Sequence, residues 1–298
     1  MAVYKRTYTR YAGPVTDERW RFLILPRYAL RSVFETRFAL AACLLALVPH
    51  LIALVLIYLR GNIDGLLAVG FADAGQALNF FSVDGSFFLT VFTFETVISF
   101  FLVALVGPGL ISPDLANNAL PLYLSRPFSR AEYVLGKLSV LMILTGLITW
   151  VPGLILFAVQ TSMAGVSWAW DNQRILWAIL LSSWIWTLTI SLIALALSAW
   201  VKWKPVAAAA LIGIFFVAAG FGTVSNGILR TNWGTLLSLG SAIRMIQRWL
   251  FLGETTYRNF MPPFGSLPTW TGLLPLIFVC AMSLWLLSWK VRPVQVVR

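Results

Sequence analysis

Two ionisable side chains lie inside long apolar stretches of this 298-residue chain. His50 is the single histidine, and Glu95 is the only acid well inside an apolar run. A carboxylate within a lipid-buried helix is costly unless it faces a partner or water. An imidazole is a suitable partner, because it exchanges a proton near neutral pH. The pair could therefore form a buried ion pair or hydrogen bond, or act as a protonation switch.

The depth of the two residues decides whether they can meet. Each lies about nine residues from the outer end of its predicted span, 38–59 for His50 and 86–110 for Glu95, which is roughly 14 Å at 1.5 Å per residue. Two adjacent antiparallel spans would bring them together. A structural clasp, or two unrelated polar residues, are the alternatives to a functional switch. Transport by a Glu95→Gln variant would separate a switch from a clasp.

Catalytic motifs are missing from the sequence. One histidine excludes a two-histidine zinc helix, and no Gly-x-Ser-x-Gly elbow occurs. The only Gly-Lys pair is Gly136-Lys137, but Ala131 and Leu138 stand where a phosphate-binding loop needs Gly and Ser or Thr. We therefore expect no catalytic residues, no metal site and no cofactor in this chain.

The composition indicates a membrane protein. Hydrophobic residues make up 59% of the chain and charged residues 11%, whereas soluble domains carry about 25% charged residues. The net charge of +11 does not indicate a nucleic-acid partner, because the basic residues lie between apolar runs instead of on one face. We predict an all-α polytopic membrane protein.

Six apolar stretches are long enough to cross the hydrocarbon core, which takes about 20 residues. Unpaired backbone groups are not tolerated in lipid, so each must be a helix. Together they form a single transmembrane domain over residues 1–298. The spans are predicted near 38–59, 86–110, 138–161, 175–200, 205–225 and 270–289.

The basic residues predict the orientation of these spans. Sixteen of the 22 Lys and Arg residues fall in segments 1–37, 111–137, 201–204 and 290–298, and six fall on the other side. Cytoplasmic loops carry the excess of basic residues. Both termini and the 111–137 loop are therefore predicted to be cytoplasmic.

The N-terminal segment, residues 1–37, is predicted to contain an interfacial amphipathic helix. Residues 18–37 mix basic and apolar positions at near-helical spacing. Pro26 is expected to break or kink this helix, because proline lacks the backbone N–H that an inner helical position needs.

A second membrane-associated helix is predicted within the outer segment 226–269. This short helix is expected to lie on or dip into the outer leaflet, with Arg244, Gln247 and Arg248 turned away from its apolar face. The opposite, apolar face carries Leu239, Ala242, Ile243, Ile246, Trp249 and Leu250.

The segment 111–137 is too apolar to be a free loop and is expected to dock against a partner. Its sequence is ISPDLANNALPLYLSRPFSRAEYVLGK, with apolar residues at helical spacing that Pro121 interrupts. The alternative is an ordinary solvated loop whose basic residues fix the topology. Those basic residues serve topology under either interpretation.

The same segment resembles the loop between the second and third spans of ABC-2 type permeases. In that family the loop carries an acidic residue, a Gly-Thr-Leu-like stretch, a leucine-rich piece, Ser-Arg-Pro, a Ser-Arg pair and Gly-Lys. The chain departs from this pattern at Asn117-Asn118, and it has Asp where Glu is usual. The matching residues are Asp114, Leu120, Leu122 to Leu124, Ser125-Arg126-Pro127, Ser129-Arg130 and Gly136-Lys137.

The resemblance implies that this loop contains a coupling helix held in a groove of a separate soluble ABC ATPase, which binds ATP and Mg²⁺. It further implies a dimer with a second permease copy or homologue, embedded in the lipids of the bacterial plasma (inner) membrane as part of an exporter. The residues implied in coupling are Asp114, Leu115, Leu120, Leu122, Arg126, Pro127, Arg130 and Lys137.

Three other classes compete with an ATPase-driven exporter subunit. A secondary transporter would need ionisable coupling groups or broken helices in matching halves. A membrane enzyme would need a clustered acid, base or metal site. A membrane assembly or anchoring subunit would transport nothing itself. A partner ATPase distinguishes the first class from these.

Overall fold

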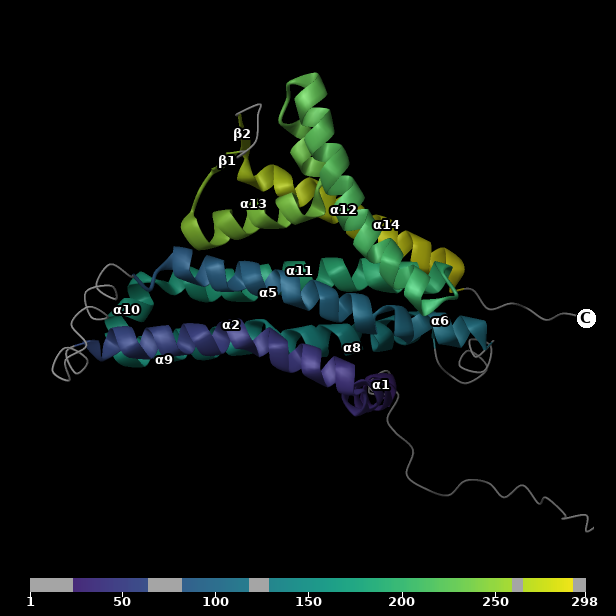
Figure 1. The fold of residues 1–298 in the computed structure, drawn as a ribbon, viewed down its shortest axis with the longest axis horizontal. Coiled ribbons are helices and arrows are strands. Elements are labelled where there is room, and N and C mark those ends of the chain that lie inside the picture. The colour runs from purple at the N-terminus through teal and green to yellow at the C-terminus, as the bar shows by residue number, and fades with distance from the viewer. Residues whose placement is uncertain (1–23, 64–81, 118–128, 259–264, 292–298) are drawn as a thin grey trace, which may run out of the picture.

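The computed structural model describes residues 24–63, 82–117, 129–258 and 265–291, and these residues are almost entirely helical (Figure 1). The first half contains α1 (Ile24–Glu35), α2 (Arg37–Gly61), α5 (Gly85–Val106), α6 (Pro108–Ala116), α8 (Arg130–Ile148) and α9 (Trp150–Ala164). The second half contains α10 (Val166–Asp171), α11 (Gln173–Trp200), α12 (Lys204–Leu229), η2 (Trp233–Leu237), α13 (Leu239–Leu252), β1 (Thr256–Arg258), β2 (Ser266–Pro268), η3 (Thr269–Gly272) and α14 (Leu273–Lys290).

Among the described residues, six helical segments are long and apolar enough to cross a membrane, and each overlaps a span predicted from the sequence. The prediction of an all-α multi-pass membrane protein is therefore confirmed. Two boundaries differ from the sequence prediction, since the second and third helical segments extend further toward the loop between them. The six segments are Arg37–Gly61, Gly85–Ala116, Arg130–Ala164, Gln173–Trp200, Lys204–Leu229 and Thr269–Lys290.

Helix α11 forms the centre of the bundle. In its most apolar stretch 72% of the residues are buried, compared with 17% in α12. It contacts α5, α6, α8 and α9 on one side and α12, α13 and α14 on the other. Figure 1 shows α2, α5, α8, α9 and α11 running along the long axis, while α12 and α14 diverge from them. Any displacement of α11 therefore reaches most of the molecule.

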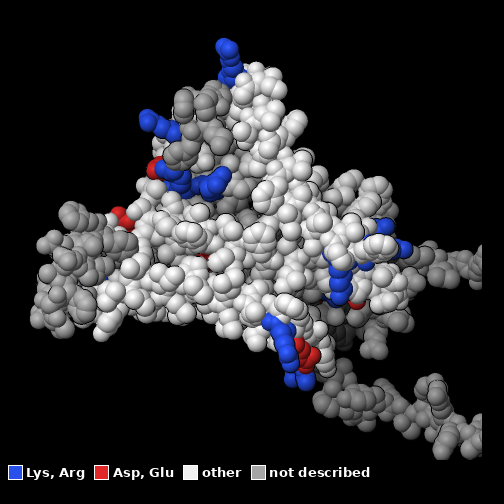
Figure 2. Space-filling view, in the orientation of Figure 1, with Lys and Arg blue, Asp and Glu red and all other residues white. Residues whose placement is uncertain are grey.

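The surface agrees with a lipid-facing bundle. Figure 2 shows a face that is mostly white, with basic side chains near α1, at the end of the bundle where α14 ends, and over the region of α13 and β1. Large apolar side chains such as Phe38, Val217 and Phe278 are more than two-thirds exposed. Such side chains need a lipid or protein environment, because exposed apolar area costs free energy in water.

The first described helix, α1, begins at Ile24, so Pro26 lies in its first turn and does not interrupt it. The first N–H groups of a helix have no acceptor within it, so proline costs little at this position. Because the residues before Ile24 lie outside the described part of the chain, the expected break or kink at Pro26 stays a prediction. The prediction that residues 18–37 contain a helix agrees with α1 for residues 24–35, and residues 18–23 lie outside the described residues. Helix α1 packs against α8 and α2.

Helix α13 lies against α5, α11 and α14, and one side chain on it differs from the sequence prediction. Gln247 was predicted on the polar face with Arg244 and Arg248, but it is 2% exposed and donates to Oγ1 of Thr96 at 3.1 Å. Trp249, predicted on the apolar face, is exposed. The helix sits between several elements and not on a flat interface, so its packed surface is wider than one apolar stripe.

Candidate functional site

The second span continues past Val106 as α6, which carries the chain toward the loop singled out in the sequence. Gly107 joins the two helices with helical backbone angles. A Cβ atom there would lie 2.8 Å from Cβ of Ala194 on α11. The joint therefore requires glycine, because any larger side chain would push α6 away from α11.

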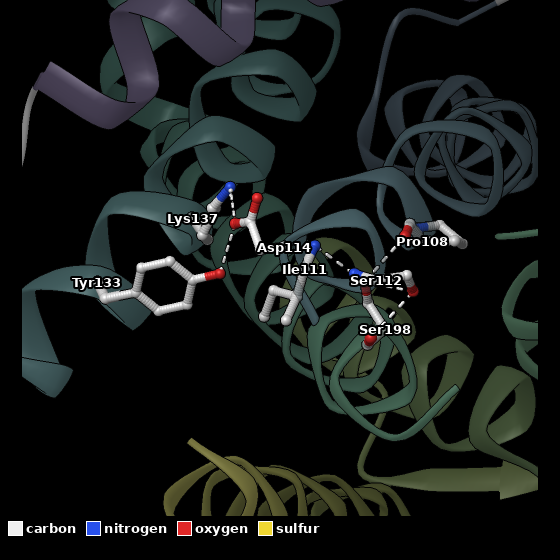
Figure 3. Close-up of polar contacts among 7 residues, drawn as sticks. All are labelled: Pro108, Ile111, Ser112, Asp114, Tyr133, Lys137 and Ser198. Carbon is white, nitrogen blue, oxygen red and sulfur yellow. Dashed lines mark hydrogen bonds and ion pairs between the residues drawn. The ribbon is translucent and has the colours of Figure 1, made fainter. Parts of the chain in front are cut away.

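An ion pair holds the two ends of this loop together. We call this contact, formed by Asp114, Tyr133 and Lys137, the neck of the loop. Nζ of Lys137 on α8 lies 2.8 Å from Oδ2 of Asp114 on α6, and the two side chains are only 10% and 16% exposed. The hydroxyl of Tyr133 donates to the same Oδ2 at 2.7 Å. The ammonium of Lys137 also lies over the Tyr133 ring, 5.5 Å from its centre. Figure 3 shows the three side chains converging from α6 and α8.

This neck fixes the spacing of the two helices that carry the loop. A charge-assisted contact is roughly twice as strong as a neutral one, and low exposure reduces its screening by salt. The loop residues 117–129 therefore leave and re-enter the bundle at positions set by Asp114 and Lys137.

Helix α8 begins with a capping box. The hydroxyl of Ser129 accepts from the N–H of Glu132 at 3.2 Å, and the N–H of Ser129 donates to Glu132 Oε2 at 2.6 Å. Two N–H groups at the helix start are satisfied in this way. The cap explains why α8 begins at Arg130, eight residues before the predicted span.

A second buried polar cluster ties α6 to α11. The hydroxyl of Ser198 accepts from the N–H of Ile111 at 3.1 Å and of Ser112 at 2.9 Å, and it donates to the carbonyl of Pro108 at 2.9 Å. The hydroxyl of Ser112 lies 2.7 Å from the carbonyl of Val201, to which it donates. Figure 3 shows this cluster beside the Asp114 neck. Helix α6 is therefore joined to both α8 and α11.

Of the coupling residues predicted from the sequence, the structure brings Asp114 and Lys137 together. Leu115 is half-buried against the hydrophobic core, and Arg130 is exposed. Leu120, Leu122, Arg126 and Pro127 lie outside the described residues.

Sequence reasoning did not identify Tyr133, Ser112 or Ser198 as site residues. Serines are frequent in spans, and the bonds of Ser198 depend on how closely α6 and α11 approach. The helical spacing of Tyr133 and Lys137, four residues apart, was the available signal for Tyr133.

His50 and Glu95 lie together in the bundle, as their matching depth predicted. Nε2 of His50 is 3.3 Å from Oε2 of Glu95, and the side chains are 5% and 2% exposed. This distance permits an ion pair, but the angles do not make a hydrogen bond, and Nδ1 of His50 has no hydrogen-bond partner among the described residues. The pair joins α2 to α5. A role for it in transport stays a hypothesis.

The described residues contain no group of three or more His, Cys, Asp or Glu side chains that could hold a metal ion. Cys43 and Cys280 are free thiols. The polar neck and the Ser198 cluster can position helices and transmit their movement.

Comparison with known protein families gives a match over most of the chain. The family described as "ABC-2 family transporter protein" matches residues 31–286. No curated protein matches the chain.

The neck contact predicts a strong coupling between Asp114 and Lys137. Lys137→Met leaves the carboxylate of Asp114 without its cation. We therefore expect the free energy of unfolding to fall by about 1–3 kcal/mol, which is less than for a fully buried ion pair. Asp114→Asn with Lys137→Met removes both charges and should recover part of this loss. Detergent unfolding of both single variants and the double variant measures the interaction. Lys202→Met, at an exposed lysine, is the matched control and should change little. Additive losses in the double variant would contradict the proposed pairing.

The Ser198 cluster predicts unequal effects of two serine-to-alanine changes on the same helix. Ser198→Ala leaves buried N–H groups of α6 without this acceptor, which costs about 1–3 kcal/mol. Ser182→Ala is the control, because that hydroxyl is equally buried but has no hydrogen-bond partner among the described residues. Unfolding midpoints of the two variants should differ by several degrees. Equal midpoints would rule out a stabilising role for the cluster.

Proposed function

Because the chain belongs to the ABC-2 family of transporter proteins, we propose that it is the membrane-spanning permease subunit of an exporter driven by a separate ATPase subunit. The chain is a multi-pass membrane protein. Members of this family are components of membrane transport systems and not enzymes themselves. The ATPase would bind ATP and Mg²⁺, and this chain would need no cofactor.

One observation carries the proposal: the loop with the family's Ser-Arg-Pro and Gly-Lys residues is fastened at its neck by Asp114, Tyr133 and Lys137. A loop that only fixed topology would need basic residues but no closed neck. A loop that receives force needs one, since slack at its ends would absorb the displacement. The neck therefore favours a docking element over a passive connection.

The contacts of α6 supply a route for that displacement. A push on the loop acts on Asp114, and α6 is fastened to α11 through Ser112 and Ser198. Helix α11 contacts most of the other spans. Because packed interiors transmit strain, movement of the loop would shift α11 relative to α2, α12 and α14, which are the less buried spans.

The orientation required by this proposal is the one that the basic residues favour. The loop, α1 and the C-terminal end of α14 would face the cytoplasm, where an ATPase finds ATP. The segment between α2 and α5 would face outward. A bacterial plasma membrane and a second permease copy complete the proposed assembly, both implied by the family.

Co-purification tests the proposal directly. The full chain, tagged and extracted from its native membrane, should bring down an ATPase with a phosphate-binding loop, identified by mass spectrometry. Replacing residues 118–128 with a Gly-Ser segment of equal length should reduce the recovered ATPase at least about tenfold, because the docking surface is removed while Asp114, Ser129 and Lys137 remain.

The matched control replaces residues 64–74, in the segment between α2 and α5, with a Gly-Ser segment of equal length. This variant should retain the ATPase. Unchanged recovery after replacement of 118–128 would contradict docking at this loop. If the unmodified chain recovers no ATPase, an ATPase-independent transporter or an anchoring subunit becomes the better interpretation.

A further inference from the structure

A polar cavity lies between α5, α13 and β1, away from the loop and its neck. It has a volume of about 220 Å³ and is lined by Leu89, Thr93, Arg244, Arg248 and Tyr257. Two guanidinium groups, a hydroxyl and a phenol thus line one hollow beside an aliphatic side chain. In Figure 2, blue side chains over the region of α13 and β1 stand out from an otherwise mostly white surface, with red next to them.

The arginines near this cavity are not equally paired. Arg248 makes two hydrogen bonds to Glu254, at 2.6 and 2.9 Å, which neutralise its charge. Arg174, from α11, donates to the carbonyls of Trp249 and Leu250 at the end of α13. A cation at a helix C-terminus is favourable there. Both of these arginines have a structural explanation.

Arg244 has no such explanation. Its only hydrogen bond among the described residues goes to the hydroxyl of Ser241 at 3.2 Å, and no carboxylate pairs with it there. A guanidinium has five N–H donors in a planar fork that fits phosphate oxygens bidentately. The cavity therefore has a surplus positive charge with unused donors.

The cavity lies beside a candidate membrane span. Thr93 lies eight residues after Gly85, the first residue of α5, or about 12 Å along the helix, and the side chain of Arg244 is exposed. A charged side chain beside a membrane span marks a ligand site or a water-filled path, because an uncompensated charge facing lipid is unfavourable. A bound anion would compensate it.

We propose that this cavity binds a phosphate group, carried by an anionic lipid headgroup or by a phosphorylated solute, with Arg244 as its principal ligand. Arg248 contributes positive electrostatic potential to the cavity, but its hydrogen bonds to Glu254 are kept. Tyr257 forms a wall, and Leu89 presents the apolar surface along which a lipid chain would continue. The site does not depend on the ATPase partner, so its failure would leave the proposed function standing.

Native mass spectrometry of the full chain in detergent tests the site with defined probes. Dioleoyl-phosphatidylglycerol should bind at least about tenfold tighter than dioleoyl-phosphatidylcholine, whose headgroup cancels its own charge. Arg244→Gln should abolish that preference, and Arg244→Lys should weaken it less, because a lysine keeps the charge without the fork. Arg258→Gln is the matched control. It removes one positive charge from β1, the strand that carries Tyr257, at a residue that does not line the cavity.

A second arm separates the two sources of phosphate. Glycerol 3-phosphate, added without lipid, should raise the unfolding temperature in an Arg244-dependent way if the ligand is a solute, and leave it unchanged if the lipid is required. The Arg244→Lys variant serves if Arg244→Gln does not fold. Absence of Arg244-dependent binding of both probes, or an equal effect of Arg258→Gln, would overturn the proposal.

Discussion

The ion pair between Asp114 and Lys137 is the contact on which the account of this molecule depends. It lies where the second and third helical segments leave the bundle, and it is shielded enough to be only weakly screened. Without it, α6 would end in a loop with a loose base, and a force applied to the loop would be lost in side-chain movement. With it, α6 and α8 are held together where the loop leaves and re-enters the bundle.

The hydrogen bonds of a single hydroxyl group connect α6 to the interior of the bundle. One hydroxyl, Ser198, satisfies two N–H groups of α6 and donates to a carbonyl at the start of the same helix. Gly107 permits the close approach that this needs. Because α11 is the most buried of the six candidate spans, a serine on its last turn links the edge of the molecule to its centre. The buried His50–Glu95 pair joins α2 to α5 in the same interior.

The fold could be predicted well from the sequence because the bilayer leaves few choices. Length and apolarity located six spans, since only hydrogen-bonded helices cross lipid. The same depth argument brought His50 and Glu95 together. What failed was local: Gln247 is buried, because α13 packs on several sides. The Ser112–Ser198 cluster could not be predicted, because it depends on how closely the backbones of α6 and α11 approach. The presence of a serine in a sequence does not reveal that distance. Two of the three neck residues, Asp114 and Lys137, were named from the family resemblance. Tyr133 was not identified from the sequence.

The side of the membrane on which the fastened loop lies tests the central claim most directly. In a chain with Cys43 and Cys280 replaced by serine, Ser125→Cys places one thiol in the loop. A membrane-impermeant maleimide should label it only after the cells are opened, because the loop must face the ATP of the cytoplasm. Labelling of that thiol in intact cells, at the rate of a cysteine placed between α2 and α5, would contradict the account.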